Sequence, residues 1–470
     1  MTTRQAAPGG RTGHALAWIV GLAMLGLVFD GYDLVVYGTV VSTFLRDATQ
    51  LGPVTPAMAG ALGSYALVGV LVGALLAGSV GDLIGRRKVM LAAYAWFSLG
   101  MAASALSTSA VAFGWMRFAT GLGIGALLAT TAALISEYAP PGKKNLFNAL
   151  TYSGIPLGSV LAAALAIALL EHVGWRGMFW IGALPIVTLL PLALFKMPES
   201  VLWLKSRGRD AEAAQVAAKY GIDLEAVGAP TPARNRPAVE SRSGYAGLFG
   251  PGYRLPTLLL GGMSAMGLLL VYSLNTWLPE LMLRAGFNAK GSLAFLLVLN
   301  GGSLLGGLAG SRLADRLGPK PVVAGAFLIG AVAIGLLTLE APLGILLLVV
   351  AIAGLGTSGT QTLIYGFVAN YYRTNVRGAG VAWCAGFGRL GGIGGPLLGG
   401  FLVGAGLALN SIFYILAALG LLGLVLTLLV PMGHRPQEPR STGIEPAPPA
   451  AGVAGSAAGP HDLQADRVEA

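Results

Sequence analysis

Residues 15–45 read ALAWIVGLAMLGLVFDGYDLVVYGTVVSTFL, a long apolar run that holds two carboxylates, Asp30 and Asp33. A run of about 20 apolar residues is enough for a helix to cross a bilayer, so this stretch predicts a transmembrane helix. Positions three apart lie on one face of a helix, and an ionised side chain at the centre of a membrane helix costs about 2.5–3.5 kcal/mol. A helix that keeps two such side chains one turn apart is predicted to use them.

The composition of the whole chain places it in a membrane. Of its 470 residues, 55% are hydrophobic and 11% are charged, and the mean hydropathy is +0.73, whereas a soluble globular protein is about 25% charged. The net charge of +10 does not indicate nucleic-acid binding, because the basic residues lie in short segments between apolar runs. The single cysteine, Cys384, excludes an intramolecular disulfide and is predicted to be a small packing residue.

Twelve apolar runs are long enough to span a bilayer, which predicts an all-α membrane protein. They form two groups of six around a polar segment. The expected fold class is therefore twelve transmembrane helices in two pseudo-symmetric six-helix bundles. The predicted spans are 16–42, 57–80, 88–107, 110–136, 146–170, 177–196, 256–282, 291–313, 321–340, 343–369, 378–404 and 409–431.

The polar segments set the domain boundaries. In the central loop, Leu204–Tyr220 is predicted to be an interfacial or soluble helix, while 229–243, rich in Pro, Arg and Ser, is predicted to be flexible. The Pro-, Ala- and Gly-rich tail cannot form a core and is predicted to be disordered. The predicted parts are an N-terminal segment (1–15), the first bundle (16–197), the central loop (198–254), the second bundle (255–432) and the tail (433–470).

The distribution of Lys and Arg predicts the orientation. An even number of spans puts both termini on one side, and cytoplasmic loops carry the excess of basic residues. With the N-terminus inside, the outer loops hold only Arg46, Arg176, Arg284 and Lys290 of the 30 Lys and Arg residues. We therefore expect both termini to lie in the cytoplasm.

The two halves repeat one another after their second helices. Residues 82–87 (DLIGRR) follow the second span, and residues 315–320 (DRLGPK) follow the eighth. The alignment pairs each aspartate, each glycine and a basic residue at the last position. Parallel repeats related by an axis along the membrane normal are a known plan of transporters, so the repeat favours a transporter.

At these residues the chain resembles the major facilitator superfamily. The loop after the second span is similar to the superfamily signature G-x-x-x-D-R-x-G-R-R, with Leu83 in place of the first arginine, a departure expected to weaken one cytoplasmic contact. Residues 117–125 (RFATGLGIG) resemble the fourth-helix motif, and Pro198-Glu199-Ser200 with Trp203-Leu204 resembles the motif after helix 6. The resemblance covers about residues 15–432.

Within the superfamily, the Asp-Gly-Tyr-Asp sequence at 30–33 most resembles the aromatic acid:proton symporter family, as do residues 137–140 (EYAP) and 386–391 (GFGRLG). The resemblance implies a transporter, not an enzyme, that imports small aromatic carboxylates such as benzoate and hydroxybenzoates by alternating access. It implies a place in the bacterial cytoplasmic (inner) membrane and no cofactor, the proton being the coupling ion. The expected partners are the organic anion, protons and the bilayer, with no nucleic acid, and the expected state is a monomer.

Four charged side chains fall in the central and outer thirds of the bilayer when depth is counted at about 1.5 Å per residue. Asp30 and Asp33 are the predicted proton-coupling residues, because burial favours a protonated carboxylate and a nearby cation favours a charged one. Arg117 and Arg389 are the predicted anion-binding residues, because the planar guanidinium matches a carboxylate with two hydrogen bonds. The alternative is that acids and arginines neutralise each other and hold helices together, and for Arg389 it is close packing among glycines.

Other polar and aromatic side chains within the spans are candidates for substrate binding. Asn275, Asn300 and Gln361 need hydrogen-bond partners in a membrane, which either a substrate or a neighbouring helix would supply. Tyr32 and Trp277 are predicted to contact an aromatic ring, although packing and interfacial belts are commoner roles. The other rings that could stack on a substrate are Tyr37, Tyr272, Tyr365 and Phe387.

Charged residues at the predicted cytoplasmic face allow two interpretations. Topology alone explains the arginines, whereas the resemblance implies a gate in which Asp82 pairs near the start of the eleventh helix, with Arg377 as the candidate, and stabilises the outward-open state. The predicted gating residues are Asp82, Arg86, Arg87, Glu137, Asp315 and Arg377. The sequence holds no metal-ligand cluster, no nucleophile–base pair and no phosphate-binding loop.

The sequence leaves four other functions to be weighed. Symport of another organic acid would use the same residues, and efflux by proton antiport is disfavoured because the Gly-Pro-x-x-Gly-Gly pattern lies at 395–400 and not in the fifth helix. Sugar transport is disfavoured because residues 263–283 lack the paired glutamines of sugar carriers. A receptor that senses a ligand without moving it would need a signalling domain, and none is recognisable in the loop or tail.

Overall fold

All regular structure in the described chain is helical, as the apolar runs predict. The segments predicted to be flexible or disordered, 229–243 and 433–470, lie outside the described residues, as does most of the predicted N-terminal segment 1–15. The described helices belong to one compact unit, residues 1–431. The computed structural model describes residues 11–139, 144–220, 244–250 and 252–431.

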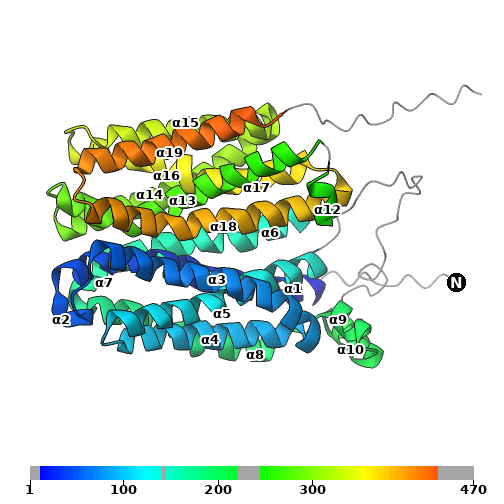
Figure 1. The fold of residues 1–470 in the computed structure, drawn as a ribbon. Helices are drawn as coiled ribbons and strands as arrows, with labels where there is room; N and C mark the ends of the chain where they lie inside the picture. Colours follow the sequence, from blue (N-terminus) through cyan, green and yellow to red (C-terminus); the bar gives the residue numbers. More distant parts are fainter. Residues whose placement is uncertain (1–10, 140–143, 221–243, 251, 432–470) are drawn as a thin grey trace, which may run out of the picture. The chain divides into compact units, whose positions relative to one another are not determined.

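The first bundle forms the lower half of Figure 1 and the second bundle forms the upper half. The first half of the chain contains α1 (Arg11–Arg46), α2 (Ala48–Leu51), α3 (Pro56–Ile84), α4 (Arg86–Leu106), α5 (Ala110–Tyr138), α6 (Lys144–Tyr152), α7 (Gly154–Gly182), η1 (Leu184–Ile186), α8 (Leu189–Lys196), α9 (Val201–Ser206) and α10 (Asp210–Tyr220). The second half contains α12 (Gly244–Leu248), α13 (Arg254–Arg284), α14 (Ala289–Leu317), α15 (Pro319–Leu336), α16 (Leu343–Gly354), η2 (Leu355–Gly359), α17 (Thr360–Tyr371), α18 (Thr374–Gly404) and α19 (Leu409–Leu429).

Ten helices among the described residues are long and apolar enough to cross a membrane. The sixth predicted span, 177–196, is not one straight helix. Its first residues belong to the part of α7 that follows the break at Gly174, where φ is 65°. It then continues through the 3₁₀ turn η1 into the short α8. The eleventh, α18, has the required length, but its many glycines and two arginines lower its hydropathy. With these two, the twelve predicted segments are all present.

The predicted helix Leu204–Tyr220 is wrong as a single element. The structure has two helices there, α9 and α10, separated at Gly208, whose φ is 70°. A positive φ is accessible to glycine at little cost and interrupts a right-handed helix. The segment is helical on both sides of Gly208, as predicted. The break at this glycine was not predicted.

The predicted repeat is visible in the geometry. Gly85 and Gly318 end α3 and α14 with nearly the same backbone angles, φ 103° and ψ 151° against φ 87° and ψ 154°. The aligned basic residues also act alike: Arg87 donates to the carbonyl of Leu194 at 2.6 Å, and Lys320 donates to the carbonyl of Leu428 at 2.9 Å. Each one thereby binds the carboxyl end of the last helix of its own bundle.

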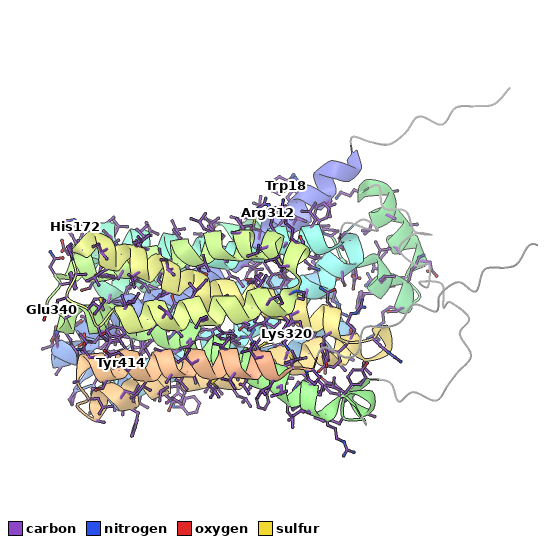
Figure 2. All side chains as sticks on the ribbon, turned by 90° about the horizontal axis from the view of Figure 1, so that it is seen from above. Trp18, His172, Arg312, Lys320, Glu340 and Tyr414 are labelled. Atoms are coloured by element: carbon purple, nitrogen blue, oxygen red, sulfur yellow. The ribbon has the colours of Figure 1, made fainter. Side chains whose placement is uncertain are left out.

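Successive long helices run in opposite directions, so their turns alternate between two ends. We call the end that carries α2 and the turn after α13 the Glu280 end, and the end that carries α9, α10 and α12 the Asp82 end (Figure 1). His172 and Glu340 lie at the first of these ends, and Lys320 lies toward the second (Figure 2). These positions agree with the predicted alternation of the spans.

Candidate functional site

The two aspartates of α1 lie inside the protein, with exposures of 9% for Asp30 and 4% for Asp33. Their depth and direction are set by close packing of α1 on α7, because the backbone at Gly31 touches the carbonyl of Ile155 and leaves no room for a Cβ atom. Small residues allow such close approach between membrane helices. The glycine between the acids thus lets α1 lie directly against α7 at the level of both carboxylates.

Asp33 and Arg117 form an ion pair within the first bundle. Nη1 of Arg117 contacts Oδ1 of Asp33, and the guanidinium lies 5.6 Å from the ring centre of Tyr37 and 5.7 Å from that of Phe179. The pair joins α1 to α5, and it is almost fully removed from water. In this conformation Arg117 uses Nη1 for Asp33 and is enclosed by rings, while its Nε is buried without a partner, so a second carboxylate would compete with Asp33 for it.

Arg389 of α18 lies in a different environment. Its side chain is partly buried, and within the described part of the chain it has no hydrogen-bond or ion-pair partner. Asp30 of the first bundle interacts with it electrostatically, without the direct contact that joins Asp33 to Arg117. An acid of one bundle and an arginine of the other thus lie within electrostatic range of each other, and neither has a hydrogen-bond partner among the described residues.

Three tyrosines accompany this second pair. Tyr152 of α6 and Tyr272 of α13 each interact electrostatically with Asp30, Arg389 and Tyr365 of α17. The hydroxyl of Tyr152 donates to the carbonyl of Leu128 at 3.2 Å. Tyr272 and Tyr365 were among the rings proposed from the sequence. Tyr152 was missed, because a tyrosine at the start of a predicted span reads as an interfacial residue.

Asn275 and Asn300 bind each other. Nδ2 of Asn300 donates to Oδ1 of Asn275 at 2.9 Å, and both amides also donate to carbonyls one turn earlier in their own helices. The pair joins α13 to α14, which is the helix-joining role considered for them. Gln361 differs, because its Nε2 donates to Oγ of Ser264 at 3.1 Å while its Oε1 is buried without a partner.

Tyr32 and Trp277 are placed as packing residues. Each is 1% exposed, and each donates its polar hydrogen to a backbone carbonyl: Tyr32 to Met178 at 2.8 Å and Trp277 to Pro396 at 3.0 Å. Neither ring offers a free face to a ligand here. In this conformation both residues have the packing role, because each polar group donates to a carbonyl of its own bundle.

The predicted pair between Asp82 and Arg377 is absent from this conformation. Asp82, whose side chain is 70% exposed, accepts a hydrogen bond from Arg86 at 2.7 Å, across the turn at Gly85 that ends α3 and begins α4. Arg377 and Asp315 are exposed. Arg86 also lies 3.7 Å from Glu137.

Glu199, which was not predicted as a site residue, organises the same corner. Its Oε1 accepts the backbone N–H groups of Arg87 and Ser200, both at 2.9 Å. A carboxylate at a helix N-terminus satisfies free donors and complements the helix dipole. Oγ of Ser200 in turn donates to Glu137. Arg87 and Glu137 thus have clear structural roles within the first bundle.

Glu280 was also missed. It is 3% exposed, and its two oxygens accept from Arg46 of α1 at 3.0 Å and from Arg284 of its own helix at 2.9 Å. The available signal was an acid inside the seventh predicted span with an arginine four residues later. Because Arg46 belongs to the first bundle and Glu280 to the second, this triad joins the two bundles.

The bundles meet at the Glu280 end. In the described part of the chain, the polar links between them are Arg46–Glu280, Lys290–Glu171 at 2.9 Å and Ser64 to the carbonyl of Ile393 at 2.7 Å. Glycines allow close contact there: a Cβ atom on Gly60 would lie 2.5 Å from the carbonyl oxygen of Pro396. The structure is therefore closed at the Glu280 end, while Asp82 and Arg377 at the other end are exposed.

Glu280→Gln is expected to loosen that closed end, because it removes the charge that holds Arg46. Arg46 is half exposed, so we expect a change of about 1 kcal/mol, or roughly fivefold in the open population. The measurement is the alkylation rate, in detergent, of the thiol introduced by Ser42→Cys in a Cys384→Ala background. Glu171→Gln, in a pair exposed on both sides, is the control. Equal rates with and without Glu280→Gln would contradict the role.

Comparison with known proteins decides the family. The sequence model of the Major Facilitator Superfamily matches residues 23–310 and 292–458. The chain belongs to the major facilitator superfamily. It is thus a multi-pass membrane transporter and not an enzyme, and the predicted twelve-helix, two-bundle fold class is confirmed.

Relatives within the major facilitator superfamily narrow the resemblance. The chain is 34% identical over 421 residues to the benzoate transport protein of Acinetobacter baylyi, covering 88% of this chain and 89% of that protein. It is 32% identical to the gentisate transporter of Corynebacterium glutamicum, covering 88% and 87% of the two chains. These relatives agree with the predicted aromatic acid:proton symporter family.

Solved structures support the superfamily fold. The xylose transporter XylE from E. coli, in a partially occluded inward-open conformation, superposes with a TM-score of 0.70 and 19% identity, covering 89% of this chain and 98% of that one. At this identity the likeness concerns the fold alone.

Proposed function

We propose that this protein is a proton-coupled importer of small aromatic carboxylates that works by alternating access. The observation that carries the proposal is the neighbouring pair of Asp30 and Arg389, one from each bundle, both without a direct partner among the described residues. Binding sites of such transporters lie between the two halves near the middle of the membrane. The relatives, which are transporters of benzoate, gentisate and gallate, supply the substrate class.

The two charge pairs suggest a division of roles. Arg389 would hold the substrate carboxylate through its planar guanidinium, and Asp30 would carry the coupling proton. Asp33 and Arg117 would keep α1 in place as a preformed ion pair. Tyr152, Tyr272 and Tyr365 would surround the aromatic ring, in place of Tyr32 and Trp277.

Orientation follows from the basic residues. We assign the Asp82 end to the cytoplasm of a bacterial cell and the termini to that side, because Arg86, Arg87, Lys88, Lys196 and Lys205 all lie there. With this orientation, the conformation closed at the Glu280 end faces the cytoplasm. The Asp82–Arg377 contact would then belong to the opposite, outward-facing state, and its absence here agrees with that assignment.

Uptake into proteoliposomes tests the function. With an inward proton gradient, we expect accumulation of labelled benzoate or a hydroxybenzoate against its own gradient, and no accumulation of a sugar. An aliphatic keto acid serves as the comparison for general organic-acid symport. Equal accumulation of the keto acid would favour that broader function. Expulsion of the aromatic acid under the same gradient would favour efflux, and failure to move any substrate would contradict transport of this class.

A further inference from the structure

The side-chain oxygen of Gln361 has no partner in the described part of the chain and takes no part in the ion pairs of the site. The side chain is 7% exposed, and Oε1 is buried with no hydrogen-bond partner. Buried acceptors without partners are uncommon in folded proteins, because each one loses its hydrogen bond to water without a replacement. In a transport site, such an oxygen could accept a hydrogen bond from the substrate.

Neighbouring groups fix the direction in which this oxygen points. Oγ of Ser264 donates to the carbonyl of Cys384 at 2.9 Å, and a carbonyl can only accept. The hydroxyl hydrogen of Ser264 is therefore already used, and Oγ can only accept from Gln361. The amide must present its NH₂ group to Ser264, so Oε1 is held on the opposite side.

The position of Gln361 places it beside the proposed site. It lies one helical turn before Tyr365 on α17 and two residues after the end of the π-helical turn η2, Leu355–Gly359. Such π turns occur often at functional sites. Ser264 lies against Gly388, the residue before Arg389, where a Cβ atom would clash with its hydroxyl.

Helix α13 packs its backbone against this oxygen. The residue that faces Oε1 is Gly267, where a Cβ atom would come within 2.5 Å of the oxygen. A side chain at this position would collide with the acceptor oxygen. Ser264 thus fixes the direction of Oε1. The oxygen lies against Gly267, which has no side chain that could pair with it.

We propose that Oε1 of Gln361 accepts a hydrogen bond from a hydroxyl group on the ring of the transported acid, so that Gln361 selects hydroxylated benzoates over benzoate. This inference rests on the proposed function of the site. A site built to bind a hydroxyl rejects an analogue that lacks it, because a buried polar group is then left unpaired. Gln361 is a specificity-determining residue, and Ser264 is a positioning residue that acts through it.

Initial uptake rates of benzoate and of its 2-, 3- and 4-hydroxy derivatives under a proton gradient test the proposal. We expect the wild type to prefer at least one hydroxy isomer by about tenfold in kcat/KM, the size of one well-formed hydrogen bond. Gln361→Met, which keeps the length of the side chain, should abolish this preference while benzoate uptake is kept or raised. Ser264→Ala, which frees the amide to turn, should reduce it.

The control is Thr360→Val, a neighbouring change of similar shape whose hydroxyl binds only the carbonyl of Gly356, at 2.8 Å. It should leave the preference unchanged. Size-exclusion profiles identify folded variants, and Gln361→Leu replaces Gln361→Met if the latter does not fold. An unchanged preference in a folded Gln361 variant, or no preference in the wild type, would overturn the inference and leave the proposed function intact. If the wild type transported no aromatic acid, both the inference and the proposed function would be wrong.

Discussion

Arg117→Leu is expected to lower the stability of the protein by about 3–5 kcal/mol, because it leaves the buried carboxylate of Asp33 without its counter-charge. In the wild type both side chains are nearly inaccessible, at 3% and 5% exposure. Asp33→Asn should also destabilise, since it leaves Arg117 unpaired. The double variant Asp33→Asn/Arg117→Leu should recover most of the loss, because it removes both charges together. Thermal unfolding of the purified protein, followed by tryptophan fluorescence, compares the three.

An exposed ion pair supplies the control for these three variants. Arg209 and Glu212 are joined at 2.5 Å, but their side chains are 44% and 50% exposed, so Arg209→Leu should change stability little. A loss no greater for Arg117→Leu than for Arg209→Leu would show that the buried pair does not hold α1 to α5. Substrate binding by the stabilised double variant adds a second result: its retention would assign the anion to Arg389, and its disappearance would assign it to Arg117.

Much of the fold could be predicted from the sequence because it depends on local patterns. Apolar runs of about 20 residues predicted the transmembrane spans. The repeated Asp-x-x-Gly-x-[Arg/Lys] pattern predicted two equivalent turns, and Gly85 and Gly318 form these turns with similar φ and ψ angles. Breaks inside apolar runs were harder to predict. Gly174 divides α7 by adopting φ 65°, yet many other glycines in this chain lie within continuous helices.

The pairing of the charged side chains could not be predicted in the same way. Counting residues along a helix gives the depth of Asp30, Asp33, Arg117 and Arg389, but not the direction in which each side chain points or which helices are neighbours. The partners of Asp33 and Glu280 depend on how α1 packs against α5 and α13. Contacts between bundles depend in addition on which end of the protein is closed.

With both aspartates ionised, the charges of the site sum to zero, and this limits what can bind. Asp30 and Asp33 oppose Arg117 and Arg389, so a monocarboxylate bound at Arg389 adds one uncompensated negative charge. Such a charge is costly where water is largely excluded, and a proton on Asp30 would cancel it. Anion and proton are then expected to bind cooperatively, with one proton per monoanion. Transport would be driven by the pH gradient and not by the membrane potential.

Asp30→Asn is therefore expected to separate binding from coupling. Asparagine imitates the protonated aspartate, so the variant should bind the anion at least as well as the wild type and should exchange labelled for unlabelled substrate across the membrane. It should not accumulate substrate under a pH gradient, because it has no proton to release. Counterflow and gradient-driven uptake in the same proteoliposomes measure the two properties. The control is Asp47→Asn, a partly exposed acid beyond the end of α1 that caps α2, a role that asparagine can also fill. Wild-type accumulation by Asp30→Asn would exclude Asp30 as the proton carrier, and loss of counterflow together with binding would make it a substrate ligand.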